Sequence, residues 1–254
     1  MVEIKCDFIG THLQQQKIPS LYRVHSGPQM KKLSSLRMML ADKGLTLAGG
    51  DKPTSHDYNA LLEQVRDLDE CDVIRTLLLR SQSQAEYSPK NMGHFGLAYD
   101  AYAHFTSPIR RYPDVMVHRL LQHYLDGGKP PHYGSYEELC DHSSEREKAA
   151  SDAERASIKY MQAVFLKQHL GQVFIGVISG VTEWGVYVEL SENYCEGMIR
   201  IRDFRDDYYT FDSKNYAIEG ENSGKIYQLG DQLTIMVKNV DLERKQIDFE
   251  PYYE

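Results

Sequence analysis

The apolar residues of the chain follow two periodicities, and the change occurs near residue 170. In residues 1–169 apolar side chains recur mostly every three or four positions, which predicts helices. Beyond Gly171 they alternate with polar side chains, which predicts strands. We therefore predict an α+β fold with two domains, a helix-rich region 1–169 and a strand-rich region 170–254.

Helical spacing is clear in several segments of the first region. Apolar positions over 30–40, preceded by Pro28, predict a helix, because proline suits a first helical turn. A second pattern over 58–68 follows Thr54 and Ser55, either of which is a suitable N-cap. Two further segments are the short, strongly apolar run 73–79 and the long, charged, alanine-rich stretch 137–169.

The second region contains five segments with strand periodicity, separated by turn residues. Five short strands in about 80 residues are typical of a small barrel, and we predict a five-stranded antiparallel OB-fold β-barrel. The predicted strands are 172–181, 185–190, 197–201, 232–240 and 244–250.

Composition excludes several classes of protein. With 41% hydrophobic residues the chain can bury a core, so it is not disordered throughout. It has no run of 18 apolar residues that would span a membrane, and its first residues lack the pattern of a signal peptide. The cysteines lie far apart without a CxxC pair, which argues against a zinc knuckle or a disulfide scaffold and favours a cytoplasmic location. They are Cys6, Cys71, Cys140 and Cys195.

The net charge of −8 is confined to the second region. Residues 170–254 contain 8 basic and 16 acidic residues, while the charges of residues 1–169 cancel. The overall field therefore does not attract a polyanion. A nucleic-acid partner would have to be bound by local clusters of basic side chains.

Residues 94–121 combine aromatic, hydroxyl, histidine and arginine side chains. Ser107 can cap a helix and Pro108 fits its first position, which predicts Arg110 and Arg111 in the first turn. Backbone amides and guanidinium groups together would form a phosphate site. Alternatively the arginines pair with nearby carboxylates, and spacing alone favours this simpler interpretation. The histidines lack metal-binding spacing, and we expect most of them to pack or to form hydrogen bonds.

The segment GHFGLAYDAYAHFTSPIRRYPDVMVHR, residues 93–119, resembles the signature of the catalytic RNB domain in the family of ribonuclease II and ribonuclease R. The second region resembles the S1-type RNA-binding domain, and its insert RDDYYTFD is similar to ribonuclease R. The resemblance covers nearly the whole chain and is weakest over 1–15 and 137–165. Other matching segments are 17–28, 60–65, 77–89, 171–190, 196–201 and 227–249.

The resemblance implies a processive hydrolase that shortens single-stranded RNA from the 3′ end to nucleoside 5′-monophosphates, assisted by Mg²⁺. It implies that Arg110 contacts the phosphate near the scissile bond and neutralises developing charge, with Arg111 as the neighbouring candidate. No small-molecule cofactor is expected. We also expect RNA contacts from the preceding residues His104, Thr106 and Ser107.

One departure from the family concerns the metal site. The family has an aspartate cluster upstream of the signature, whereas the acidic residues before His94 are scattered. We therefore predict no metal ligands in this chain, which resembles the C-terminal third of the parent enzyme, and expect the isolated chain to be inactive. In the long helix, Glu154 is the nearest match to an acidic residue that relatives place near the 3′-terminal nucleotide. An exposed glutamate in an i,i+4 ion pair is an equally good interpretation.

In the strand-rich region, Trp184 and Tyr187 flank Gly185 where relatives display two aromatic residues on the RNA-binding face. Exposed rings would stack on bases of any sequence. In a regular strand these two positions face opposite ways, so one ring would be buried unless Gly185 introduces a bulge. The remaining RNA-binding candidates are Phe174, Arg200, Asp241 and Lys245.

Three hypotheses follow for function. The chain is part of an exoribonuclease, or a non-catalytic RNA-binding protein derived from that enzyme, or a subunit whose metal site another chain supplies. The first and third predict activity once the missing N-terminal part is added. The second predicts binding of RNA only.

Overall fold

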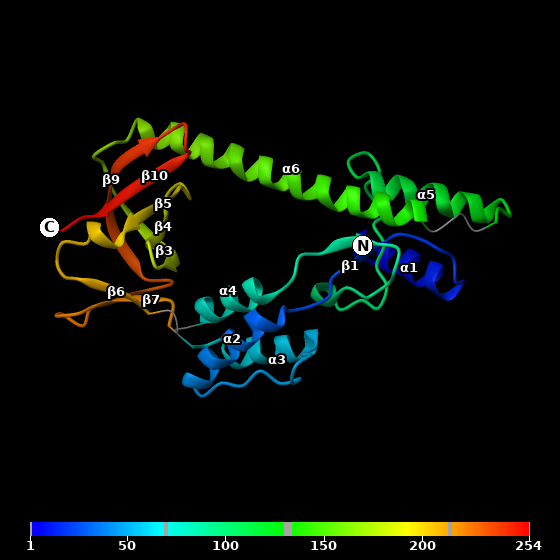
Figure 1. Ribbon diagram of the computed structural model, residues 1–254, viewed down its shortest axis with the longest axis horizontal. Helices are drawn as coiled ribbons and strands as arrows, with labels where there is room; N and C mark the ends of the chain where they lie inside the picture. Colours follow the sequence, from blue (N-terminus) through cyan, green and yellow to red (C-terminus); the bar gives the residue numbers. More distant parts are fainter. Residues whose placement is uncertain (1, 69–70, 130–133, 213–214, 254) are drawn as a thin grey trace. The chain divides into compact units, whose positions relative to one another are not determined.

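The computed structural model describes residues 2–68, 71–129, 134–212 and 215–253 (Figure 1). The chain divides into two compact units. The first comprises Met1–Leu40, Gly44–Arg66 and Leu77–Ala150, and the second comprises Ala41–Lys43, Asp67–Thr76 and Ser151–Glu254. A helix-rich part followed by a barrel is the fold class that the sequence predicts, and the structure confirms it.

Six α-helices are described. The predicted helix over 30–40 is α2, whose buried side chains Leu33, Leu36 and Leu40 have helical spacing. Thr54 caps α3, because its hydroxyl accepts from the amide of Asp57 while the Asp57 carboxylate accepts from the amide of Thr54. The helices are α1 (Val2–Gln15), α2 (Met30–Asp42), α3 (Ser55–Gln64), α4 (Cys71–Ser81), α5 (Tyr112–Leu125) and α6 (Gly134–Lys167).

A hydrophobic core within the first unit holds the segment between strand β2 and helix α5 in place. Strands β1 (Tyr22–Val24) and β2 (Glu86–Ser88) form an antiparallel pair, and the 3-10 turn η1 (Phe95–Leu97) follows. The amide of Tyr87 donates to the Ser144 hydroxyl of α6, at 3.0 Å. The buried side chains of this core come from α1, β2, α5, α6 and the residue before β1, and they are Leu13, Leu21, Tyr87, Met116, Val117, Leu120 and Cys140.

The second unit contains a closed barrel with the strand order β10-β5-β4-β3-β9 (Figure 1). All five predicted strands are present. One detail of the prediction is wrong, because β5 and β10 pair in parallel while the other four pairs are antiparallel. A closed ring with an odd number of strands cannot alternate in direction all the way round. The strands are β3 (Val173–Thr182), β4 (Gly185–Leu190), β5 (Glu196–Arg200), β9 (Gln232–Asp241) and β10 (Gln246–Pro251).

A short insert between β5 and β9 forms a second, three-stranded antiparallel sheet. The turn η2 (Ile201–Asp203) leads into β6 (Tyr209–Asp212), which is followed by β7 (Ala217–Gly220) and β8 (Ile226–Gln228). These strands of three or four residues carry too few positions for a periodicity, which is why the sequence did not predict them. Three buried rings hold the insert together, with centroids 5.0–5.5 Å apart, and they belong to Phe204, Tyr209 and Tyr227.

The four cysteines are buried and unpaired. This agrees with the prediction that they form no disulfide scaffold. Among the helices in the described ranges, none combines the length and the apolar character needed to cross a membrane.

Candidate functional site

The arginine segment precedes α5 as a turn, which corrects the predicted helix start. The amides of Arg110 and Arg111 both donate to the carbonyl of Ser107, at 3.2 and 3.1 Å, and the helix begins only at Tyr112. Ser107 is therefore not an N-cap, and Pro108 is not the first helical residue. A helix beginning at Pro108 would place Pro113 in its interior, where the ring clashes with the preceding turn. Beginning at Tyr112, the helix has Pro113 in its first turn, where proline is tolerated.

A buried carboxylate organises this turn. The side chain of Asp114 is fully buried, and its Oδ2 accepts from the Ser107 amide at 2.7 Å and from Arg111 Nη2 at 2.9 Å. Its Oδ1 lies 2.9 Å from Arg111 Nε. A buried charge needs such a partner, because an unpaired one is very costly. Arg111 therefore follows the simpler interpretation of the sequence, an arginine paired with a carboxylate.

Arg110 has a different environment. Its side chain is exposed, and no ion pair or hydrogen bond of its guanidinium is found within the described part of the chain. Its neighbour Ile109 is 98% exposed, so the turn projects into solvent. The structure thus leaves Arg110 available to an anion, while Arg111 holds the turn.

His104 lies beside this turn in a cluster of polar and aromatic groups. Its Nδ1 is 2.9 Å from the Tyr87 hydroxyl. Burial, followed by the positive charges of Arg111 and Arg23, lowers the pKa of His104 to about 3. Arg23 lies over the Tyr87 ring, 4.7 Å from its centroid, and forms an ion pair with Glu147 of α6. His104 is consequently neutral at pH 7 and acts as a hydrogen-bonding group rather than a cation.

The other histidines of the segment also pack and form hydrogen bonds, as predicted. His118 Nε2 lies 2.7 Å from the Phe105 carbonyl, and its ring stacks on Phe105. His94 Nδ1 accepts from the Leu97 amide, and burial lowers the pKa of His94 to about 4. One histidine that the sequence pattern did not indicate is His25, which is buried against the rings of His94 and Phe95.

Two further predicted residues have environments of their own. Thr106 is partly buried, and its hydroxyl is 3.7 Å from the Cys6 thiol of α1. Glu154 is exposed on the part of α6 that belongs to the second unit, and no ion pair involves it in the ranges that the structure describes. The i,i+4 pair considered for Glu154 is therefore not formed here.

Metal ligands do not gather among the described residues, since no three His, Cys, Asp or Glu side chains there are placed to hold an ion. The acidic run before α4 extends over 67–72, but Asp69 and Glu70 lie outside the described residues. The donor set that these ranges provide does not fit a Mg²⁺ site.

The two aromatic side chains of the barrel, Trp184 and Tyr187, both project outward, one from a turn and the other from a strand. Trp184 lies in the two-residue turn between β3 and β4 and is 70% exposed, so strand alternation does not govern its direction. Tyr187 points outward from β4, opposite Met198 of β5. No bulge in β4 is needed. Gly185 is required for close approach, since a Cβ there would overlap the carbonyl oxygen of Ile199.

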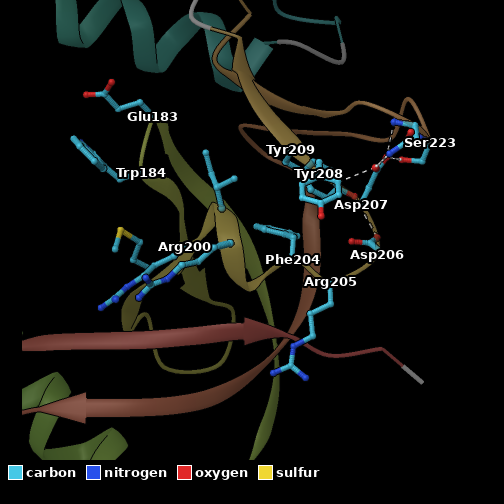
Figure 2. A pocket seen from close by; sticks show the side chains of 14 residues that line it. Glu183, Trp184, Arg200, Phe204, Arg205, Asp206, Asp207, Tyr208, Tyr209 and Ser223 are labelled. Atoms are coloured by element: carbon cyan, nitrogen blue, oxygen red, sulfur yellow. Dashed lines mark hydrogen bonds between the residues drawn. The ribbon is translucent and has the colours of Figure 1, made fainter.

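Several of the predicted RNA-binding residues line two neighbouring cavities on the second unit. Trp184, Met198 and Arg200 line a cavity of about 1290 Å³, shown in Figure 2, and Tyr187, Met198 and Lys245 line one of about 140 Å³. Met198 belongs to both. Arg200 pairs with Asp248 of β10, at 3.2 Å. The outer surface of β4, β5 and β10 thus brings together four predicted RNA-binding residues, namely Trp184, Tyr187, Arg200 and Lys245.

Phe174 and Asp241 do not line these cavities. Phe174 packs partly against the barrel core and contacts the ring of His169. Asp241 accepts from the amide of Arg244 at 3.0 Å in the turn between β9 and β10. Both positions support the barrel in this structure.

The insert contributes to the larger cavity, which the sequence pattern did not indicate. Arg202 of η2 and Arg205 and Tyr208 of the following loop line it. The loop is held by Asp207, whose carboxylate accepts from the amides and side chains of Ser223 and Asn222. These hydrogen bonds, those of Ser223 foremost, hold the pKa of Asp207 well below its usual range. The sequence feature that could have indicated this contribution is the adjacent pair Tyr208 and Tyr209, which follows two aspartates.

Comparison with known protein families finds a match in each half of the chain. Residues 7–127 match the RNB domain, and residues 167–250 match the S1 RNA binding domain. Ribonuclease R of Escherichia coli (strain K12) is 39% identical over 249 residues, covering 93% of this chain and 31% of that protein. The chain therefore spans about a third of the length of such relatives.

Comparison with solved structures finds a ribonuclease R among the similar folds. The apo form of Mycoplasma genitalium RNase R superposes with a TM-score of 0.88 at 29% identity, covering 99% of this chain and 40% of that one. The same enzyme in complex with ribose methylated single-stranded RNA has a TM-score of 0.87 over the same shares of the two chains.

Proposed function

We propose that this chain, which corresponds to the C-terminal part of the RNB domain and the S1 domain of ribonuclease R, is the RNA-holding part of a 3′-to-5′ exoribonuclease. The observation that carries the proposal is the exposed Arg110 beside the ion pair of Arg111 and Asp114. We place the boundary between the two domains at residues 169 and 170.

In this proposal the two arginines have separate roles. Arg110 contacts the phosphate next to the scissile bond and neutralises the charge that develops on its oxygens. Arg111 is a positioning residue, since its ion pair with Asp114 and the bond from the Ser107 amide to Asp114 fix the turn that presents Arg110. His104, which lies beside Tyr87, hydrogen-bonds to the RNA as a neutral group.

The barrel holds the single strand upstream of the cleaved end. Trp184 and Tyr187 stack on bases, and Arg200 and Lys245 contact the backbone from the same outer surface. The domain has more acidic than basic residues, so the number of phosphate contacts is small. Stacking therefore supplies most of the affinity of this domain.

Hydrolysis requires residues beyond those described. In the parent enzyme, Mg²⁺ would activate water and stabilise the phosphate charge. The described residues do not fit such a site, and we propose that the upstream part of the enzyme supplies its carboxylates. The isolated chain then binds RNA without cleaving it.

A 5′-labelled single-stranded RNA tests this proposal, incubated with the chain in the presence and absence of Mg²⁺. We expect a shifted band on a native gel and no shortening on a denaturing gel. Progressive shortening from the 3′ end by this chain alone, stopped by a chelator, would contradict the proposed inactivity. Absence of any shift at micromolar protein would contradict RNA binding itself.

The lack of a metal-binding group among the described residues also favours a second candidate, a non-catalytic RNA-binding protein. The two are separated by adding the upstream part of a relative's RNB domain as a second polypeptide. Magnesium-dependent shortening in the mixture would establish the exoribonuclease, whereas binding without shortening would favour the second candidate.

A further inference from the structure

The cavity of about 1290 Å³ is lined by two parts of the second unit, the barrel and the insert. One wall is the outer surface of the barrel, with Trp184 and Arg200. The other is the insert, with Arg202 and Tyr208. Figure 2 shows Trp184 and Tyr208 on opposite sides of the cavity.

The two aromatic rings at the cavity are unusually accessible. Trp184 is 70% and Tyr208 is 78% exposed. Their rings are not needed for the core of the insert, which Phe204 and two other buried rings form. A large exposed apolar ring indicates a binding surface when a second one lines the same cavity. Flat rings of this kind stack on nucleobases irrespective of sequence.

The basic side chains at the cavity differ in whether they already have partners. Arg200 pairs with Asp248 at 3.2 Å, and Arg205 lies 3.5 Å from Glu250. Arg202 is exposed and has no ion pair within the ranges described. Among these three, Arg202 is therefore the side chain whose charge a ligand can use without displacing a carboxylate.

Two of the acidic side chains at the cavity, Asp206 and Asp207, already have hydrogen-bond partners within the protein. The Asp207 carboxylate accepts from Asn222 and Ser223, and Asp206 accepts from the hydroxyl of Tyr253 at 2.8 Å. Asp206 also lies 3.4 Å from Lys225. Glu183 remains at the exposed turn and opposes an anionic ligand. Among the described side chains that line the cavity, Arg202 is the one cation without an ion pair. Aromatic surface together with this cation fits one nucleotide better than a bare anion.

We propose that this cavity is a nucleotide subsite of single-stranded RNA, formed jointly by the barrel and the insert. One base stacks against Tyr208 across from Trp184, and the adjoining phosphate binds Arg202. This inference rests on the proposed RNA binding of the barrel and adds the insert as a second wall of the RNA path. The volume of the cavity exceeds the roughly 300–1,000 Å³ of ordinary ligand pockets, so a nucleotide and its neighbours fit.

The chain contains one tryptophan, so Trp184 fluorescence is a direct reporter of binding at this cavity. The experiment titrates the 254-residue chain with an octamer of uridylate. We expect the octamer to quench the fluorescence. Tyr208→Ala should weaken binding about tenfold, while Tyr208→Phe should bind like the unchanged chain because it keeps the ring. Arg202→Gln should reduce the slope of log affinity against log salt by about 0.7.

Two matched controls isolate the cavity. Tyr194→Ala removes a tyrosine of similar exposure, 69%, from a turn that does not line the cavity. Arg66→Gln removes one positive charge from the surface of the other compact unit. Both controls should bind like the unchanged chain. Thermal unfolding of all variants verifies that each is folded.

The outcomes separate the two proposals. If the octamer neither binds nor quenches the unchanged chain, RNA binding by the barrel fails and this inference fails with it. If the unchanged chain binds and is quenched, but Tyr208→Ala and Arg202→Gln behave like their controls, the barrel binds RNA and the insert does not take part. Equal loss in Tyr208→Phe and Tyr208→Ala would also overturn stacking as the cause.

Discussion

Two arginine–aspartate pairs, one in each compact unit, differ mainly in burial. In Arg111–Asp114 the arginine side chain is 19% exposed and the aspartate is fully buried, whereas in Arg200–Asp248 the exposed fractions are 37% and 16%. Beside each pair lies an exposed arginine without an ion pair in the described residues, Arg110 or Arg202. The first pair fixes a backbone turn. The second lies on an outer surface where a phosphate can compete for the arginine, because solvent weakens an exposed pair.

The largest expected effect comes from breaking the buried pair. Asp114→Ala should lower the free energy of unfolding by about 3–5 kcal/mol, because Arg111 and the Ser107 amide would remain buried without a partner. Asp248→Ala should lower it by about 1 kcal/mol or less, since its partner is partly in water. Urea denaturation measures both. Equal losses in the two variants would show that burial does not distinguish the pairs.

Within the first unit, the neighbouring arginines should respond oppositely. Arg110→Ala should leave the free energy of unfolding within about 0.5 kcal/mol but lower the cleavage rate of the chain supplemented with the upstream part about 10²–10³-fold. Arg111→Ala should destabilise the fold, because it leaves the Asp114 carboxylate unpaired. Unfolding curves and single-turnover rates test this. An unfolded Arg110→Ala variant, or one with full rate, would contradict the assignment.

On the barrel, Trp184→Ala should weaken binding of single-stranded RNA by about 1–3 kcal/mol, since one stacking surface is lost. Trp184→Phe should retain most of the affinity, because a smaller ring still stacks. Fluorescence anisotropy of a labelled oligonucleotide gives both Kd values. Tyr194→Ala again serves as the matched control. A Trp184→Phe variant as weak as Trp184→Ala would show that the ring acts through something other than stacking.

A further expected effect is a pH dependence that arises in the first unit. The pKa of His104 is lowered to about 3 and that of His94 to about 4, while an unfolded histidine titrates near 6.5. The unfolded chain therefore binds more protons below about pH 6.5, and the free energy of unfolding falls as the pH drops from there toward 4. Urea denaturation between pH 5 and 7.5 should show this slope.

His104→Asn should flatten part of that slope, because it removes one of the two groups. His56→Asn, which replaces an exposed histidine, serves as the control and should leave the slope as it is. An unchanged slope in His104→Asn would mean that its neutral state does not depend on folding.

Much of the fold could be predicted because periodicity reports it directly. The barrel strands alternate apolar and polar residues, and α2 buries Leu33, Leu36 and Leu40 at helical spacing. The insert escaped prediction because its strands are three or four residues long. The start of α5 was predicted wrongly because Pro108 and Pro113 each suit the first turn of a helix. A helix that began at Pro108 would place the Pro113 ring in its interior, where it clashes with the preceding turn, so the helix begins at Tyr112.

The sequence predicted which residues belong to the candidate site, but not which of them are free to bind a ligand and which hold the fold. The sequence placed Arg110 and Arg111 together, yet which of them is available depends on the burial of Asp114, which no local pattern reports. Likewise Trp184 and Tyr187 both face outward because Trp184 lies in the turn before β4, where strand alternation does not set the direction of a side chain. Tyr208 and Arg202 reach the same cavity only through the fold of the insert.

Gly185 has a consequence for how substitutions near the aromatic pair will be interpreted. Any side chain at this position would overlap the Ile199 carbonyl oxygen of the neighbouring strand. In a saturation mutagenesis screen scored by RNA binding, Gly185 should therefore rank among the least tolerant positions, although it has no side chain that could touch RNA. Only a parallel measurement of protein abundance would separate such a scaffold position from Trp184, whose loss should spare abundance and weaken binding alone.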